Sequence, residues 1–176
     1  GMGADRAVHV KDPEIDGSDA LGVAKVLAAV AKEENPDLIL MGMMSDDGNF
    51  AAVGPMLAEL CGVPHATAVV KAEKKNGGYE VERELEGGAL QVYSLPVPCL
   101  LAVQTGINQV RYASLKGIMA AKRKPLEKKD ASTAESRLSV DALELPPARP
   151  EGRVVGEGPE AVAELVRLLR EEAKVI

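Results

Sequence analysis

The chain has 176 residues, of which 46% are hydrophobic and 2% aromatic, and it carries a formal net charge of −6. This length suits one domain with a core of its own, and the hydrophobic content excludes an intrinsically disordered chain. The acidic balance and the scarcity of aromatic side chains argue against nucleic-acid binding, and no stretch approaches the ~18 apolar residues of a membrane span.

The first 60 residues predict alternating strands and helices. Ala7–Val10 is a short β-prone run, and a helix is expected to follow and to continue through Glu34. Leu38–Met41 is a continuous apolar run, which is typical of a parallel strand buried on both faces, and a second helix is expected to end at Leu60. This order of elements favours an open α/β sheet. The residues that could cap the first helix are Asp16, Ser18 and Asp19.

After residue 64 the pattern changes to short β-prone runs separated by glycine-containing hairpin signals. These runs are Ala66–Glu73, Tyr79–Glu86 and Ala89–Leu95. Cys99–Val103 predicts a further buried strand, and a short helix is expected near Leu115–Ala121. The expected fold class is therefore α/β: an open, mostly parallel sheet with an appended antiparallel β meander.

The last part of the chain predicts an extended arm that ends in a helix. Residues 122–158 are polar and contain four prolines, and Gly158-Pro159-Glu160 is a helix-start signal. One face of that helix is apolar: Val162, Leu165, Val166, Leu169 and Ala173. A helix at the end of such an arm needs a surface that buries this face, either its own domain or a partner chain.

The loop between the second strand and the second helix is the candidate ligand site. In open α/β sheets ligands bind at the carboxyl ends of strands, and a helix start offers free N–H groups that suit a phosphate. The alternative is an ordinary turn in which Asp47 or Asn49 caps the helix, because neither a P-loop nor a GxGxxG motif is present. The candidate cofactor-binding residues are Asp47, Gly48, Asn49, Phe50, Ala51, Ala52, Val53 and Gly54.

No catalytic or metal site is expected from the residue patterns. Asp46-Asp47 lacks the spaced oxygen ligands of a calcium loop, and no serine or cysteine has an evident base partner. Cys61 and Cys99 form no CxxC motif, so we expect two plain buried thiols in a reducing compartment.

Charge is distributed unevenly along the chain. Residues 1–60 hold eleven acidic and four basic side chains, whereas residues 116–129 hold six basic side chains and one acidic. The basic run is either a solvated segment or a docking patch for an acidic partner.

Three segments, in this order, closely resemble the β subunit of electron-transfer flavoproteins. They are Val53–Leu60, Val81–Gly88 and Val110–Pro125. The resemblance extends over Gly1–Ile176, and the family's opening segment is expected to be absent. In the family that segment supplies a strand in the middle of the sheet, so we expect its absence to expose strand edges.

The resemblance implies a heterodimer whose α subunit carries the redox-active FAD. The β chain of the family holds AMP or, in electron-bifurcating members, a second FAD. The implied role is that of an electron carrier, not an enzyme, which accepts electrons from acyl-CoA or related dehydrogenases of fatty acid β-oxidation and delivers them to a membrane quinone oxidoreductase. The implied compartment is a bacterial or archaeal cytoplasm or the mitochondrial matrix. A different class of function, a stand-alone ATP- or AMP-binding module of universal-stress-like fold, is the alternative.

The resemblance also assigns residues. The family loop that matches Asp47–Gly54 holds the nucleotide phosphates, although this chain has Phe50-Ala51-Ala52 where members carry Thr-Gly-Gln or Thr-Ala-Gln. The segment that matches Leu115–Lys124 is a recognition loop in which the leucine enters an apolar pocket of the partner dehydrogenase. The implied docking residues are Leu115, Ile118, Met119, Lys122, Arg123 and Lys124. The alternative is that Leu115 and Ile118 are simply core residues.

The residue pattern and the family resemblance together predict that the chain has two parts. Residues 1–121 are expected to form the α/β nucleotide-binding domain. Residues 122–176 are expected to form a C-terminal arm with a terminal helix, because Ser139–Ile176 matches the family extension that wraps the α subunit.

Overall fold

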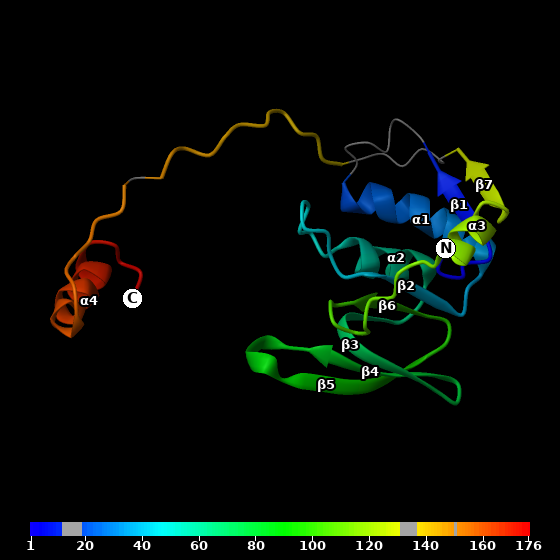
Figure 1. Cartoon of the computed structure of the whole chain (residues 1–176), viewed down its shortest axis with the longest axis horizontal. Helices are drawn as coiled ribbons and strands as arrows, with labels where there is room; N and C mark the ends of the chain where they lie inside the picture. Colours follow the sequence, from blue (N-terminus) through cyan, green and yellow to red (C-terminus); the bar gives the residue numbers. More distant parts are fainter. Residues whose placement is uncertain (12–18, 131–136, 150) are drawn as a thin grey trace. The chain divides into compact units, whose positions relative to one another are not determined.

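The computed structural model of the chain describes residues 1–11, 19–130, 137–149 and 151–176 (Figure 1). Its residues fall into two compact units, 1–140 and 141–176. In the described residues the first unit contains two β-sheets and the helices α1, α2 and α3, and the second contains the helix α4.

The larger sheet has five strands in the order β2-β6-β3-β4-β5. The first three, β2 (Leu38–Gly42), β6 (Cys99–Val103) and β3 (His65–Lys75), run parallel to one another. The other two, β4 (Gly78–Glu84) and β5 (Leu90–Pro96), continue from β3 as an antiparallel meander. The predicted α/β class with an appended meander is confirmed.

The smaller sheet pairs β1 (Ala7–Val10) with β7 (Leu126–Lys129) in parallel. The strand β7 lies in the stretch for which the sequence predicted only extended chain. Leu-Glu-Lys-Lys contains one apolar residue, so no hydrophobic alternation marked it as a strand. Ion pairs of Arg6 with Glu34 and of Lys129 with Glu33 connect this sheet to the end of α1.

The helices α1 (Ala20–Glu34) and α2 (Val53–Cys61) begin and end close to the predicted positions. Asp19 caps α1, whereas the other two candidate caps, Asp16 and Ser18, lie outside the described residues. α1 and α2 pack side by side (Figure 1), and together with β6 they form one core cluster. Its buried residues are Ala24, Ala28, Leu57, Ala58, Leu100 and Ala102.

The prediction that Leu38–Met41 is buried on both faces is wrong. Leu40 is 62% exposed, and the buried strand of the sheet is β6, in which Leu100 and Leu101 are 0% exposed. The difference arises because β2 is an edge strand that pairs only with β6 among the described strands. A residue on an edge strand lacks the neighbouring side chains that would cover it.

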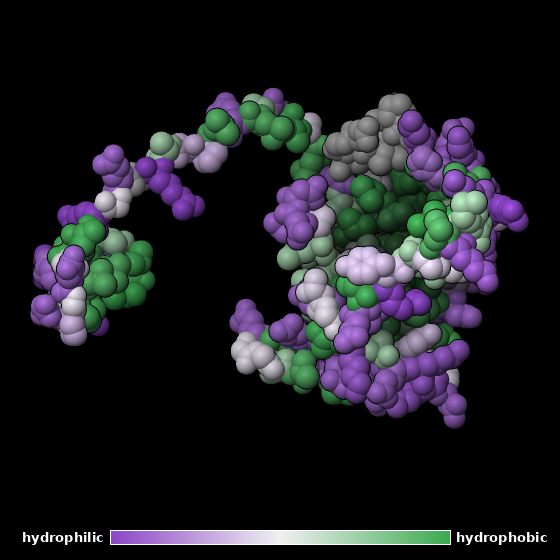
Figure 2. All heavy atoms as spheres, in the orientation of Figure 1, coloured by the Kyte–Doolittle hydropathy of each residue, from purple (hydrophilic) through white to green (hydrophobic). Residues whose placement is uncertain are grey.

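The second unit consists of an extended segment, a 3-10 turn (Pro159–Ala161) and α4 (Val162–Glu171). None of the residues of α4 is buried, and Val162 and Leu165 are 55% and 43% exposed. Figure 2 shows apolar atoms gathered on one side of this helix. Arg167 forms ion pairs with Glu164 and Glu171, which support the helix locally.

Candidate functional site

The loop that connects β2 to α2 is held by its own hydrogen bonds. The Asp47 carboxylate accepts from the Ser45 hydroxyl and from the Gly48 N–H, the latter at 2.7 Å, and both bonds lower its pKa. The Asn49 side-chain amide donates to the Asp46 carbonyl at 3.3 Å. The side chains of Asp47 and Asn49 are therefore engaged within the loop and stabilise its conformation.

The start of α2 has no side-chain cap. The N-cap residue is Ala52, and no side chain of the described residues bonds to the helix start. The capping role that the ordinary-turn alternative gave to Asp47 or Asn49 is therefore wrong. Ala51 has a left-handed backbone with a φ of 50°, which turns the chain into the helix.

Two backbone donors at this helix start have no carbonyl partner within the described residues. Pro55 has no N–H, and the Met56 N–H donates to the Ala52 carbonyl at 3.1 Å. The N–H groups of Val53 and Gly54 belong to the first turn, where an α-helix offers no carbonyl partner. Together with the helix dipole, these donors suit an anionic group such as a phosphate.

Gly54 brings this first turn close to the sheet. A Cβ at Gly54 would lie 3.3 Å from Met41 Sδ and 3.4 Å from Ala102 Cβ. The contact with Met41 Sδ is tighter than most Cβ contacts, so a larger residue would require the Met41 side chain to shift by a few tenths of an ångström. The small residue therefore lets the first turn of α2 approach the sheet closely.

The neighbouring loop after β6 starts at the same edge of the sheet. The Met43 N–H donates to the Val103 carbonyl at 3.0 Å, and the Gln104 N–H donates to the Val69 carbonyl at 2.9 Å. The carboxyl ends of the parallel strands β2 and β6 therefore lie together, with the candidate loop and the start of α2 above them. This is the edge at which open α/β sheets bind ligands.

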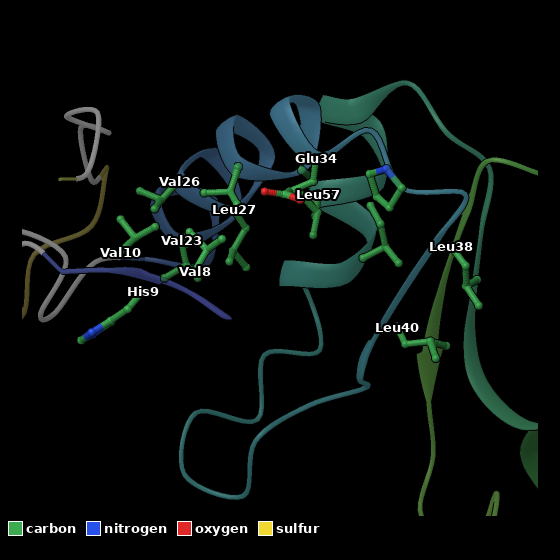
Figure 3. A pocket seen from close by; sticks show the side chains of 14 residues that line it. Val8, His9, Val10, Val23, Val26, Leu27, Glu34, Leu38, Leu40 and Leu57 are labelled. Carbon is green, nitrogen blue, oxygen red and sulfur yellow. The ribbon is translucent and has the colours of Figure 1, made fainter. Parts of the chain in front are cut away.

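A separate groove of about 600 Å³ lies between β1 and β2 and is lined by α1 and by Leu57 of α2 (Figure 3). Its lining is mainly aliphatic, and Figure 2 shows a recess of apolar atoms in this unit. His9 turns its ring away from the aliphatic side chains, and Glu34 is paired with Arg6. Because this groove offers hydrophobic surface without a helix start, it does not suit a phosphate, and none of the eight candidate cofactor-binding residues lines it.

The implied docking residues lie on and just after α3 (Leu115–Ala121), which Ser114 caps by accepting from the Gly117 N–H at 3.1 Å. All six side chains are exposed: Leu115, Ile118, Met119, Lys122, Arg123 and Lys124. Leu115 is 78% and Ile118 46% exposed, so the alternative that these two are core residues is wrong. The structure thus brings an exposed apolar turn next to three cationic side chains, of which Lys124 pairs with Asp5 at 3.3 Å.

The two thiols differ in their surroundings. Cys99 is 1% exposed, and burial raises its pKa, as expected for an unreactive thiol. Cys61 is only partly buried, so the prediction that both thiols are buried is wrong for this residue. Cys61 lies at the end of α2, where only one side of the helix faces the core.

The described residues lack both a metal-binding cluster and a membrane-spanning helix. Among these residues no cluster of three or more His, Cys, Asp or Glu side chains could hold a metal ion. No helix in the same ranges is long and apolar enough to cross a bilayer.

Comparison with known proteins gives a consistent result. The family model described as "Electron transfer flavoprotein domain" matches residues 1–134. The chain is 39% identical to the "Electron transfer flavoprotein subunit beta" of Bacillus subtilis, over 99% of this chain and 71% of the relative. It is 36% identical to the subunit of the same name from Methylophilus methylotrophus, over 96% and 69% of the two chains. A mitochondrial subunit of Arabidopsis thaliana is also 36% identical, over 99% of this chain and 69% of the relative.

Proposed function

The chain belongs to the electron transfer flavoprotein family, with β subunits as its relatives, and on that premise we propose that it is the β subunit of a heterodimeric electron carrier. It holds AMP or a second FAD, and it docks the dehydrogenases that reduce the FAD of an α subunit. Its donors are acyl-CoA or related dehydrogenases, and its acceptor is a quinone oxidoreductase. The compartment is a bacterial or archaeal cytoplasm or a mitochondrial matrix.

The proposal that the chain binds a nucleotide rests on the uncapped start of α2 at the carboxyl edge of the sheet. The N–H groups of Val53 and Gly54 supply donors that do not depend on side-chain identity. These donors support the proposal of phosphate binding here although Phe50-Ala51-Ala52 replaces the hydroxyl and amide that the family carries at these positions. The Asp47 carboxylate is engaged by Ser45 and Gly48 within the loop.

The test is to place a carboxylate at the helix start. Ala52→Asp introduces the preferred type of N-cap, so helix stability is expected to be maintained or to rise. The new carboxylate occupies the free N–H groups and repels a phosphate, so the purified heterodimer should lose its nucleotide. Ala52→Asn is the matched control, because it caps the helix without adding charge and should retain more nucleotide than Ala52→Asp. An Ala52→Asp heterodimer with the parent's nucleotide content would refute the site.

The nucleotide itself is identified by releasing the bound small molecules and determining their masses. A β site that holds AMP predicts a single flavin per heterodimer. A second flavin, stoichiometric with this chain, would instead indicate an electron-bifurcating member. Visible absorbance of the same sample gives the flavin count independently.

The partner part of the proposal is supported by two exposed apolar surfaces. The helix α4 presents Val162 and Leu165 to solvent at the end of the arm, and α3 presents Leu115 beside basic side chains. We assign the arm to the α subunit and α3 to the dehydrogenase. Removal of residues 139–176 should abolish co-purification with the α subunit, and full yield of the heterodimer without this segment would contradict the assignment.

A further inference from the structure

The carboxylate of Asp19 joins two segments that are far apart in the sequence. One oxygen, Oδ1, accepts from the Gly22 N–H at 2.7 Å, and the other, Oδ2, accepts from the Arg137 N–H at 2.8 Å. Arg137 lies 118 residues further along the chain. The backbone N–H groups of Leu21 and Leu138 also interact with this carboxylate.

The two oxygens serve different purposes. An N-cap needs a single acceptor oxygen, which serine, threonine and asparagine also provide. The bond from Oδ1 to Gly22 fills that requirement for α1. The second oxygen, Oδ2, accepts from the backbone N–H of Arg137, so this contact does not depend on the identity of the side chain at position 137.

Side-chain burial contributes little to holding this part of the chain. All side chains of residues 137–149 are exposed, with Leu138 65% and Val140 71% exposed. The backbone bonds to Asp19 therefore attach the last residues of the first unit to the start of α1.

We propose that Asp19 is a clasp that fixes the base of the C-terminal arm, residues 137–140, to the first turn of α1. The clasp holds the backbone of Arg137 and Leu138 at the first turn of α1. The pKa of Asp19 is lowered, first by the Gly22 bond and then by the Arg137 bond, so the carboxylate is ionised at neutral pH. Hydrogen bonds to an ionised acceptor are shorter and stronger than neutral ones.

The test separates the clasp from the cap. In Asp19→Asn the amide oxygen still caps α1, but an NH₂ group replaces Oδ2 and cannot accept from Arg137. Hydrogen exchange measured by mass spectrometry on the full chain should then show ~10–150-fold faster exchange at the Arg137 amide, followed in a peptide that covers residues 137–145, the range expected for the loss of a hydrogen bond to a charged acceptor. A peptide from α1 should exchange at the parent's rate.

Two further variants complete the design. Arg137→Ala keeps the backbone donor and should leave both peptides unchanged, whereas Asp19→Ala removes cap and clasp and should speed up exchange in both. Unchanged exchange at residues 137–145 in Asp19→Asn would overturn the proposal. The proposal would also be overturned if exchange at residues 137–145 became faster only when α1 lost protection as well, because Asp19 would then act through the cap alone.

Discussion

Replacing Leu115 by alanine should weaken docking of the partner dehydrogenase without affecting the fold. Leu115 is 78% exposed, so most of its surface is available for burial by a partner. Burying a whole leucine side chain is worth about 1.5–3 kcal/mol, and scaling by the exposed fraction gives about 1.2–2.3 kcal/mol for this contact. That loss corresponds to ~7–50-fold weaker partner binding. Alanine is at least as good a helix former as leucine, so α3 should persist.

The assay is electron transfer from the donor dehydrogenase to the purified heterodimer, measured against heterodimer concentration. The Leu115→Ala variant should need ~7–50-fold more heterodimer for half-maximal rate, with flavin content and Tm close to the parent's. Leu90→Ala is the matched control, because Leu90 is 53% exposed on β5, outside the docking segment. Parent-like donor kinetics in a well-folded Leu115→Ala heterodimer, or unfolding of the variant, would refute the reasoning.

Four further outcomes are expected. Leu100→Ala, at a 0% exposed position, should lower the free energy of unfolding by about 2–5 kcal/mol in urea titration. Neutralising residues 122–124 should reduce mainly the association rate with the donor in stopped-flow experiments, an effect that should fade as salt rises. An alkylating reagent should label Cys61 in the folded chain but Cys99 only after unfolding, because Cys99 is buried and its pKa is raised. The folded-state pKa of Asp19 lies below its unfolded value of ~3.9, so its contribution to stability is present above that value and is lost as the pH falls through the folded pKa. The free energy of unfolding of Asp19→Asn should therefore fall less steeply with decreasing pH than that of the parent.

The sequence by itself determined the elements that carry their own local signals. Leu115–Ala121 and Cys99–Val103 have the predicted bounds, and an uninterrupted apolar run marks the second of them within a few residues. The hairpin turns were evident from their glycines for the same reason. The candidate loop was also recognisable from its position between an apolar run and a helix, which depends only on the order of elements along the chain.

Only the tertiary structure decided what each of these residues faces. Leu40 has the sequence surroundings of a buried strand and is exposed because β2 lies at an edge. Asp47 has the residue type and position of a helix cap, yet its carboxylate bonds within the loop and leaves Ala52 at the start of α2 without a side-chain cap. The pairing of β7 with β1 and the bond between Asp19 and Arg137 join segments more than a hundred residues apart. Such contacts depend on how the whole chain packs, and no pattern of a few neighbouring residues encodes them.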